Sequence, residues 1–206
     1  ALHFHRRMDL YRGHQAAGLW RREAETDAAA TRIGLLGLGT LGRACAAALR
    51  PLGFALRGWS RTPQALDGVE TFHGADGLGD FLAGTDILAC LLPLTAETRG
   101  ILDARLFARL PRGACLINAA RGGHLVEADL LAALDSGRLR GALLDVFEPE
   151  PLRPDHPFWS HPAITVTPHI AARTLAEPSA RQIAEAIAAL EAGGAPPGLV
   201  DRERGY

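Results

Sequence analysis

Residues 31–49 read TRIGLLGLGTLGRACAAAL, in which a short apolar run leads into a glycine-rich turn and then into a helix-like segment. The turn has the pattern GxGxxG. Between a strand and a helix, the first glycine permits the tight turn and the second lets the backbone approach a pyrophosphate, while the third allows close contact between helix and strand. The segment therefore predicts a dinucleotide site at a helix N-terminus, with a glycine-rich turn that binds nothing as the alternative. The predicted contacts are Gly37, Gly39, Thr40, Leu41 and Gly42.

Beyond this turn, short apolar runs alternate with helix-like stretches up to about residue 170. Several runs are nearly continuous, as expected for strands that are covered on both faces. The predicted strands are residues 33–36, 54–59, 87–92, 115–117, 142–146 and 164–166, and the predicted helices between them are residues 43–50, 103–110 and 127–135. This alternation predicts an α/β fold with a Rossmann-type, doubly wound parallel sheet.

A helix is predicted to flank the sheet at each end of the chain. Apolar side chains at helical spacing over residues 3–20 predict a leading helix within a segment of residues 1–22. A closing helix over residues 175–192 has Pro178 in its first turn. We divide the chain into a dinucleotide-binding domain, residues 1–174, and a C-terminal helix and tail, residues 175–206.

The composition argues against several classes of protein. The formal net charge of −1 argues against a nucleic-acid partner, and no apolar run reaches the roughly 18–20 residues of a membrane helix. All 22 basic residues are Arg, which excludes a P-loop or Schiff-base lysine. Cys45, Cys90 and Cys115 lie far apart and predict buried residues of a reducing compartment, not disulfides or a zinc site. We expect a cytoplasmic protein, and a piece of a longer chain because it does not begin with Met.

The second predicted strand is followed by Ser60, Arg61 and Thr62. Enzymes that use NAD place a carboxylate here, about 20 residues beyond the turn, for the ribose 2′-hydroxyl. A carboxylate would repel a 2′-phosphate, whereas a guanidinium and two hydroxyls can hold one. The pattern therefore predicts NADPH rather than NADH; the alternative is that Arg61 is an ordinary solvated arginine.

Three polar residues follow the later strands: Arg121, Glu150 and His169. Ligands of open parallel sheets bind beyond the carboxyl ends of the strands, so we expect the three to converge. Reduction of a carbonyl beside a carboxylate needs a cation to hold that carboxylate, an acid to supply a proton, and a second carboxylate to keep the acid protonated. Taken alone, Arg121 could be an ordinary surface arginine, Glu150 a helix-capping glutamate and His169 a loop histidine. The other histidines show no ligand pattern, and no metal site is predicted: His3, His5, His14, His73, His124, His156 and His161.

The motifs GLGTLG, LLPLT, INAARG, VEADLLAALDSGRLRGALLDVFEPEPL and TPHIAA, in this order, resemble the D-isomer-specific 2-hydroxyacid dehydrogenase family over essentially the whole chain. The resemblance implies that Arg121 binds the substrate, that Glu150 is the carboxylate partner and that His169 is the general acid. It also implies that Asp145 hydrogen-bonds the nicotinamide carboxamide. Leu92 and Pro93 belong to a loop that would lie over the cofactor.

The resemblance further implies NADPH-dependent reduction of a small 2-keto acid, such as glyoxylate or hydroxypyruvate. The family begins with a substrate-binding domain that this chain lacks, and residues 175–206 would return to it. Residues 1–22 resemble part of a homodimer interface. Two other functions stay open: a dinucleotide-binding, corepressor-like protein, and a truncated interaction protein without catalysis.

Overall fold

The computed structural model describes residues 1–172 and 174–200, which fall into two compact units. The first unit, Ala1–Pro168, contains the sheet, and the second begins at His169 and contains helix α7 (Ala176–Glu191). The predicted domain boundary lay after residue 174. The first unit ends six residues earlier because its last strand already ends at Val166.

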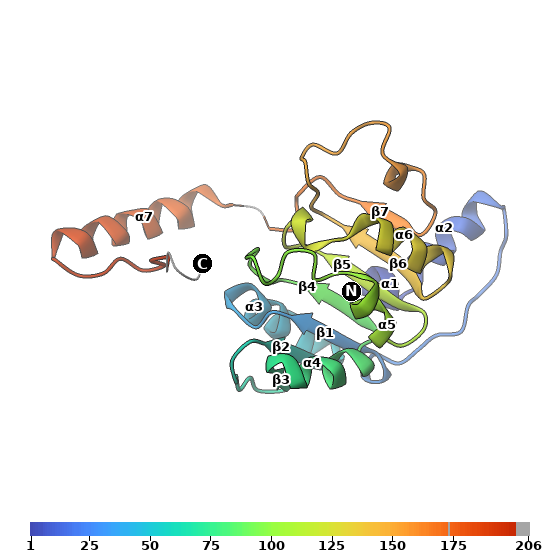
Figure 1. Cartoon of the computed structure of the whole chain (residues 1–206), viewed down its shortest axis with the longest axis horizontal. Helices are drawn as coiled ribbons and strands as arrows, with labels where there is room; N and C mark the ends of the chain where they lie inside the picture. Colours follow the sequence, from blue (N-terminus) through green and yellow to red (C-terminus); the bar gives the residue numbers. More distant parts are fainter. Residues whose placement is uncertain (173, 201–206) are drawn as a thin grey trace. The chain divides into compact units, whose positions relative to one another are not determined.

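A seven-stranded sheet forms the centre of the first unit, with every neighbouring pair of strands parallel (Figure 1). The strand order is β3-β2-β1-β4-β5-β6-β7, which reverses direction at β1 as in a doubly wound Rossmann sheet. This confirms the predicted fold class. The strands are β1 (Arg32–Leu36), β2 (Ala55–Ser60), β3 (Glu70–His73), β4 (Ile87–Cys90), β5 (Ala114–Asn118), β6 (Leu139–Leu144) and β7 (Ile164–Val166).

Two hydrophobic cores form because successive side chains of a strand point to opposite faces. On β1, Leu36 belongs to one core, whereas Ile33 and Leu35 belong to the other. The first core includes residues of α4, α5 and α6, and the second includes residues of α1 and α3. The helices of this unit are α1 (Leu2–His5), α2 (Met8–Ala16), α3 (Thr40–Leu49), α4 (Gly74–Ala83), α5 (Ala104–Arg109) and α6 (Glu127–Asp135).

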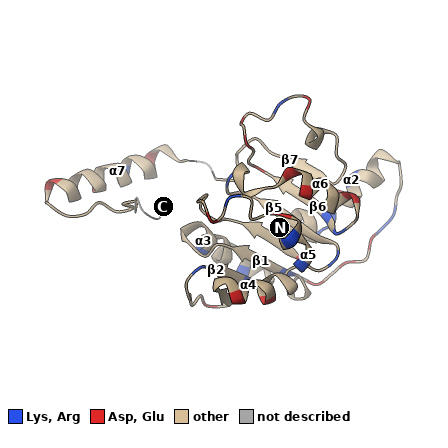
Figure 2. Ribbon diagram, in the orientation of Figure 1, with Lys and Arg blue, Asp and Glu red and all other residues tan. Residues whose placement is uncertain are grey.

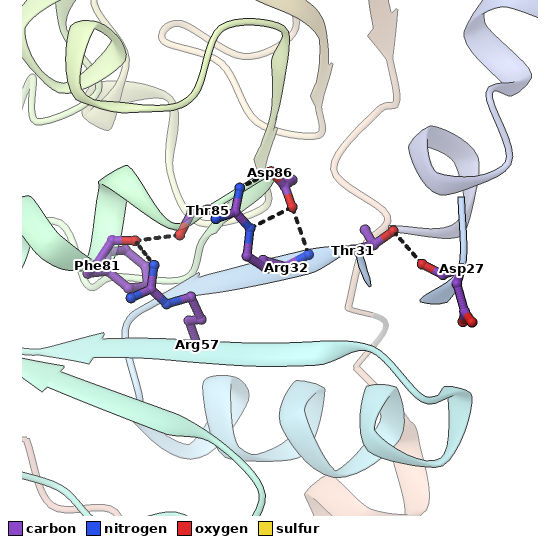
Figure 3. A network of polar contacts seen from close by, with 7 residues as sticks. All are labelled: Asp27, Thr31, Arg32, Arg57, Phe81, Thr85 and Asp86. Carbon is purple, nitrogen blue, oxygen red and sulfur yellow. Dashed lines mark hydrogen bonds and ion pairs between the residues drawn. The ribbon is translucent and has the colours of Figure 1, made fainter. Parts of the chain in front are cut away.

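A polar network anchors the first strand to the fourth (Figure 3). The guanidinium of Arg32 donates to both carboxylate oxygens of Asp86, at 2.9 and 2.6 Å, and the backbone N–H of Arg32 donates to the same carboxylate at 2.9 Å. Nearby, the carbonyl of Phe81 accepts hydrogen bonds from Arg57 and Thr85. The contacts between Arg32 and Asp86 join the beginnings of β1 and β4.

The leading helix departs from the prediction. It is broken into α1 and α2 at Arg7, whose φ of 56° is left-handed. Arg140 of β6 explains the break, because it donates to the carbonyl of Phe4 at 3.2 Å and to the carboxylate of Asp9 at 2.6 Å. Phe4 stays buried in the core while both acceptors contact this arginine.

The segment β3–α4 was not predicted at all. Its helix contains Gly74, Gly77 and Gly79, and glycine is the poorest helix former after proline. Packing against the core compensates, because Phe81 and Leu82 of this helix are fully buried.

The described residues contain no helix that is both long and apolar enough to span a bilayer. Basic and acidic residues are interspersed over the elements of the sheet unit (Figure 2).

Candidate functional site

The predicted site residues of the first unit follow one row of the sheet. The strand registers pair Trp59 with Leu36, Leu36 with Cys90, Cys90 with Asn118, and Asn118 with Leu144, which in turn pairs with Val166. The next residue of each strand or loop is therefore brought to the same carboxyl edge. These residues are Ser60, Gly37, Leu91, Ala119, Asp145 and Thr167.

The glycine-rich turn has the geometry that its sequence predicts. Gly37 has a φ of 114°, and a Cβ at Gly42 would lie 2.0 Å from the carbonyl oxygen of Gly37, so side chains are excluded there. A Cβ at Gly39, in contrast, would meet nothing within 4 Å. Thr40 and Leu41 open helix α3, whose N-terminus has no side-chain cap. The turn thus leaves free space in front of a helix N-terminus, which suits an anion.

The end of β2 carries the predicted 2′-phosphate contacts. The hydroxyl of Ser60 donates to the carbonyl of Thr62 at 2.8 Å, and Arg61 and Thr62 are exposed. The hydrogen bond from Thr95 holds the pKa of Glu97 below its usual value, with a smaller contribution from the charge of Arg61. Arg61 therefore lies within electrostatic reach of the loop that follows β4.

The loop after β4 lies directly against the glycine-rich turn. A Cβ at Gly37 would come within 3.0 Å of the backbone of Leu91 and 3.2 Å of the nitrogen of Leu92. Leu92 is buried, whereas Pro93 is half-buried. The predicted cofactor loop and the predicted diphosphate turn are thus neighbours in the fold.

Arg121 begins a tight loop after β5. Its side chain is exposed and donates to the carbonyl of Ala120 at 2.6 Å, and its own carbonyl accepts from Nδ2 of Asn118 at 3.1 Å. The loop contacts the segment after β6, because a Cβ at Gly122 would lie 2.0 Å from the carbonyl carbon of Phe147.

His124 lies beneath this loop, and sequence reasoning missed it. It is fully buried, with its ring nitrogens 3.1 Å from the carbonyl oxygen of Arg121 and 3.2 Å from that of Pro93. No sequence pattern could reveal it, because both partners are backbone atoms. Its place three residues after Arg121 was the one available signal.

Asp145 and Glu150 both lie after β6. Asp145 is buried, receives a 2.5 Å hydrogen bond from the hydroxyl of Thr167 and donates its own N–H to the carbonyl of Asn118. The exposed Glu150 accepts a hydrogen bond from the backbone N–H of Phe147 at 2.9 Å. Since Phe147 also contacts Gly122, the structure brings the Arg121 loop and the Glu150 loop together.

His169 opens the second unit. It is exposed, and its φ of 53° is left-handed. Its convergence with Arg121 and Glu150 remains a prediction.

The cysteines and histidines form no metal centre within residues 1–172 and 174–200, where no three potential ligands cluster. Cys90 and Cys115 are buried free thiols, and burial raises the pKa of each to about 12. Cys45 is half-buried.

Comparisons with known proteins identify the family of the chain. Residues 1–171 match the family model for the NAD-binding domain of D-isomer-specific 2-hydroxyacid dehydrogenases. Curated relatives include glyoxylate/hydroxypyruvate reductase A of Yersinia enterocolitica, 49% identical over 205 residues, and that of Serratia proteamaculans, 51% identical over the same length. The alignments cover all of this chain and 66% of each relative, so the chain spans somewhat less than two thirds of their length.

A solved structure of a family member from Xanthobacter autotrophicus, in complex with NADPH and MES, superposes with a TM-score of 0.97 at 47% identity. The alignment covers all of this chain and 85% of that one. An NADPH-dependent glyoxylate/hydroxypyruvate reductase from Sinorhizobium meliloti, in complex with NADP and sulfate, gives 0.95 at 43% identity and covers all of this chain and 66% of that one. The chain therefore belongs to the D-isomer-specific 2-hydroxyacid dehydrogenase family and carries its NAD-binding domain.

Proposed function

We propose that the intact protein is an NADPH-dependent reductase of small 2-keto acids such as glyoxylate and hydroxypyruvate. The observation that carries the proposal is the row of strand ends, which places the glycine-rich turn, the Arg121 loop and Asp145 along one edge of the sheet. Relatives at 49% and 51% identity are named as reductases of these acids, which supports the same substrate class here.

The residues of the turn fit a phosphorylated dinucleotide. Open space at Gly39 and the uncapped N-terminus of α3 suit the diphosphate. Arg61 would hold the 2′-phosphate, and the buried Asp145 would accept a hydrogen bond from the carboxamide. When bound, NADPH supplies the hydride for the keto carbon. NADPH and NADP in the complexes of two related structures support this choice.

The remaining residues would handle the substrate and its proton. The exposed guanidinium of Arg121 would bind the substrate carboxylate in a bidentate pair and polarise the adjacent carbonyl. His169 would donate a proton to the carbonyl oxygen as that oxygen gains charge, and Glu150 would favour the protonated form of His169. These roles rest on the residue types, on their positions after successive strands and on the family resemblance.

We propose in addition that the intact protein is a homodimer formed through residues 1–22. Trp20 in this segment is 100% exposed, and Leu19 and Met8 of the same segment are 46% and 47% exposed. Such an apolar surface is typical of an interface. Light scattering should report a dimer that Trp20→Ser weakens, and a wild-type monomer would contradict the proposal.

Substitution of His169 tests the catalytic proposal. In the intact protein, His169→Ala should lower kcat for glyoxylate by about 10²- to 10⁴-fold, the usual contribution of a general acid, while NADPH still binds. The matched control is His73→Ala, because His73 is an exposed histidine at the end of β3. Near-normal turnover by His169→Ala would remove this residue from the mechanism. Binding of NADPH without any wild-type turnover would favour the corepressor-like or non-catalytic alternative.

Substitution of Arg61 tests the cofactor proposal. The ratio of Kd for NADH to Kd for NADPH should fall by about 10- to 100-fold in Arg61→Asp, since a charge-assisted contact is lost and a repulsive one is gained. Arg105→Asp, an exposed arginine on α5, is the charge-matched control. A wild-type protein that prefers NADH would contradict the proposal.

A further inference from the structure

We propose that His124 is a positioning residue that holds Arg121 in place through the backbone carbonyl of that arginine. The inference rests on the proposed function, because it assigns to His124 the task of orienting the substrate-binding arginine. The ring lies between two loops of different strands, with Nδ1 3.1 Å from the Arg121 carbonyl and Nε2 3.2 Å from the Pro93 carbonyl.

The surroundings of the ring leave it little freedom. His124 is 0% exposed, and its own carbonyl accepts from the backbone N–H of Leu102 at 2.9 Å. The preceding Gly123 accepts from Gly100 at 2.9 Å, so two backbone bonds already join the loops after β4 and β5. The buried ring faces both carbonyls at once in one orientation, so it supports the interior of the two loops.

Each carbonyl that His124 contacts also has a second donor. The Arg121 carbonyl accepts from Nδ2 of Asn118 at 3.1 Å, and the Pro93 carbonyl accepts from the hydroxyl of Thr98 at 2.6 Å. A continuous path of side-chain contacts therefore runs from the end of β5 to the loop after β4. His124 is the side chain that both halves share, and its loss would remove one of the two side-chain contacts that hold the Arg121 carbonyl.

The two halves of the contact can be separated by substitution. A carbonyl oxygen only accepts hydrogen bonds and a neutral imidazole carries one ring hydrogen, so the proposal assigns that hydrogen to Nδ1, which faces the Arg121 carbonyl. The amide nitrogen of Asn can take the place of Nδ1 and keep the contact with Arg121, whereas that of Gln can take the place of Nε2 and keep the contact with Pro93. His124→Asn should therefore keep the hydrogen bond to the Arg121 carbonyl, whereas His124→Gln should lose it.

Steady-state kinetics of the intact protein, with glyoxylate as the varied substrate, test this assignment. We expect His124→Gln to raise KM for glyoxylate about tenfold with kcat within about threefold of wild type, whereas His124→Asn stays within about threefold in both. In an Arg121→Ala background, His124→Gln should have no further effect on kcat/KM, because the residue acts through Arg121. Thermal unfolding of each variant checks that the fold is retained.

Two results would count against the inference, and a third would count against the proposed function. Equal effects of Gln and Asn, or an undiminished effect of Gln in the Arg121→Ala background, would show that His124 supports the fold alone. An unchanged KM in Arg121→Ala would refute the proposed function instead. If His124→Gln does not fold, Asn118→Ala removes the other side-chain donor to the Arg121 carbonyl; it should raise KM for glyoxylate about tenfold, and this rise should vanish in the Arg121→Ala background.

Discussion

Replacement of Gly42 by alanine is expected to damage the fold of the turn. A Cβ at this position would lie 2.0 Å from the carbonyl oxygen of Gly37, about 1 Å inside the 3.0 Å limit that real side chains respect. The oxygen cannot easily move away, because the N–H of Gly37 is bonded to Trp59 and Gly37 itself lies against the backbone of Leu91. Overpacking of this kind costs about 1–3 kcal/mol, and contact with backbone places it near 3 kcal/mol. The better helix propensity of alanine returns about 1 kcal/mol, which leaves a net loss of about 2 kcal/mol.

Urea denaturation of wild type and Gly42→Ala measures this loss directly as a difference in the free energy of unfolding. Gly39→Ala is the matched control, because a Cβ there meets nothing within 4 Å. The free energy of unfolding of Gly39→Ala should fall by at most about 1 kcal/mol, which is the cost of an alanine at an N-cap. Its affinity for NADPH should nevertheless fall at least about tenfold, since the new methyl group would occupy space needed by the diphosphate. If Gly42→Ala proved as stable as wild type, or if Gly39→Ala kept full NADPH affinity, the reasoning about this turn would be refuted.

Three further outcomes follow from contacts away from the turn. Asp103→Ala removes the side-chain cap of α5 and should lower the free energy of unfolding by about 1 kcal/mol in urea titrations. Iodoacetamide at pH 8 should leave Cys90 and Cys115 unmodified in the folded protein, because burial raises the pKa of both thiols to about 12; rapid modification followed by mass spectrometry would contradict this. Burial raises the pKa of Asp86, but the hydrogen bonds from Arg32 outweigh burial and keep the pKa in the folded protein below the usual value of 3.8. The stability that this lowered pKa contributes above pH 3.8 should be lost as the pH falls through the folded pKa. The loss of stability with pH should be less steep in Arg32→Gln.

The parts of the fold that the sequence predicts correctly are those with local causes. The glycine-rich turn needs small residues at fixed spacing, and the helix of residues 127–135 matches α6 at both ends. Strand ends shifted by a few residues: residues 142–146 were predicted where β6 covers Leu139–Leu144. Hydrophobicity marks the buried part of a strand, whereas its hydrogen-bonded length depends on the neighbouring strand.

The parts that were missed have causes far away in the chain. Helix α4 forms despite three glycines because its Phe81 and Leu82 are buried in the core, and local helix propensity does not contain that information. The break between α1 and α2 depends on Arg140, which is 136 residues beyond Phe4. A pattern of helical spacing over residues 3–20 contains no information about this contact with Arg140.

The same distinction separates two kinds of functional residue. Arg121 was predicted because it follows a strand, Gly37 because it belongs to the GxGxxG pattern, and Asp145 because of the family resemblance. The parallel register carries the ends of the strands that precede them to one edge. His124 also follows a strand, but it binds backbone carbonyls, which every residue possesses. A residue that contacts a ligand must have a suitable chemical type, and that type is visible in the sequence. A residue that positions another by its backbone can be identified only after the loops have been placed, so buried polar side chains beneath a predicted site are where such residues should be sought.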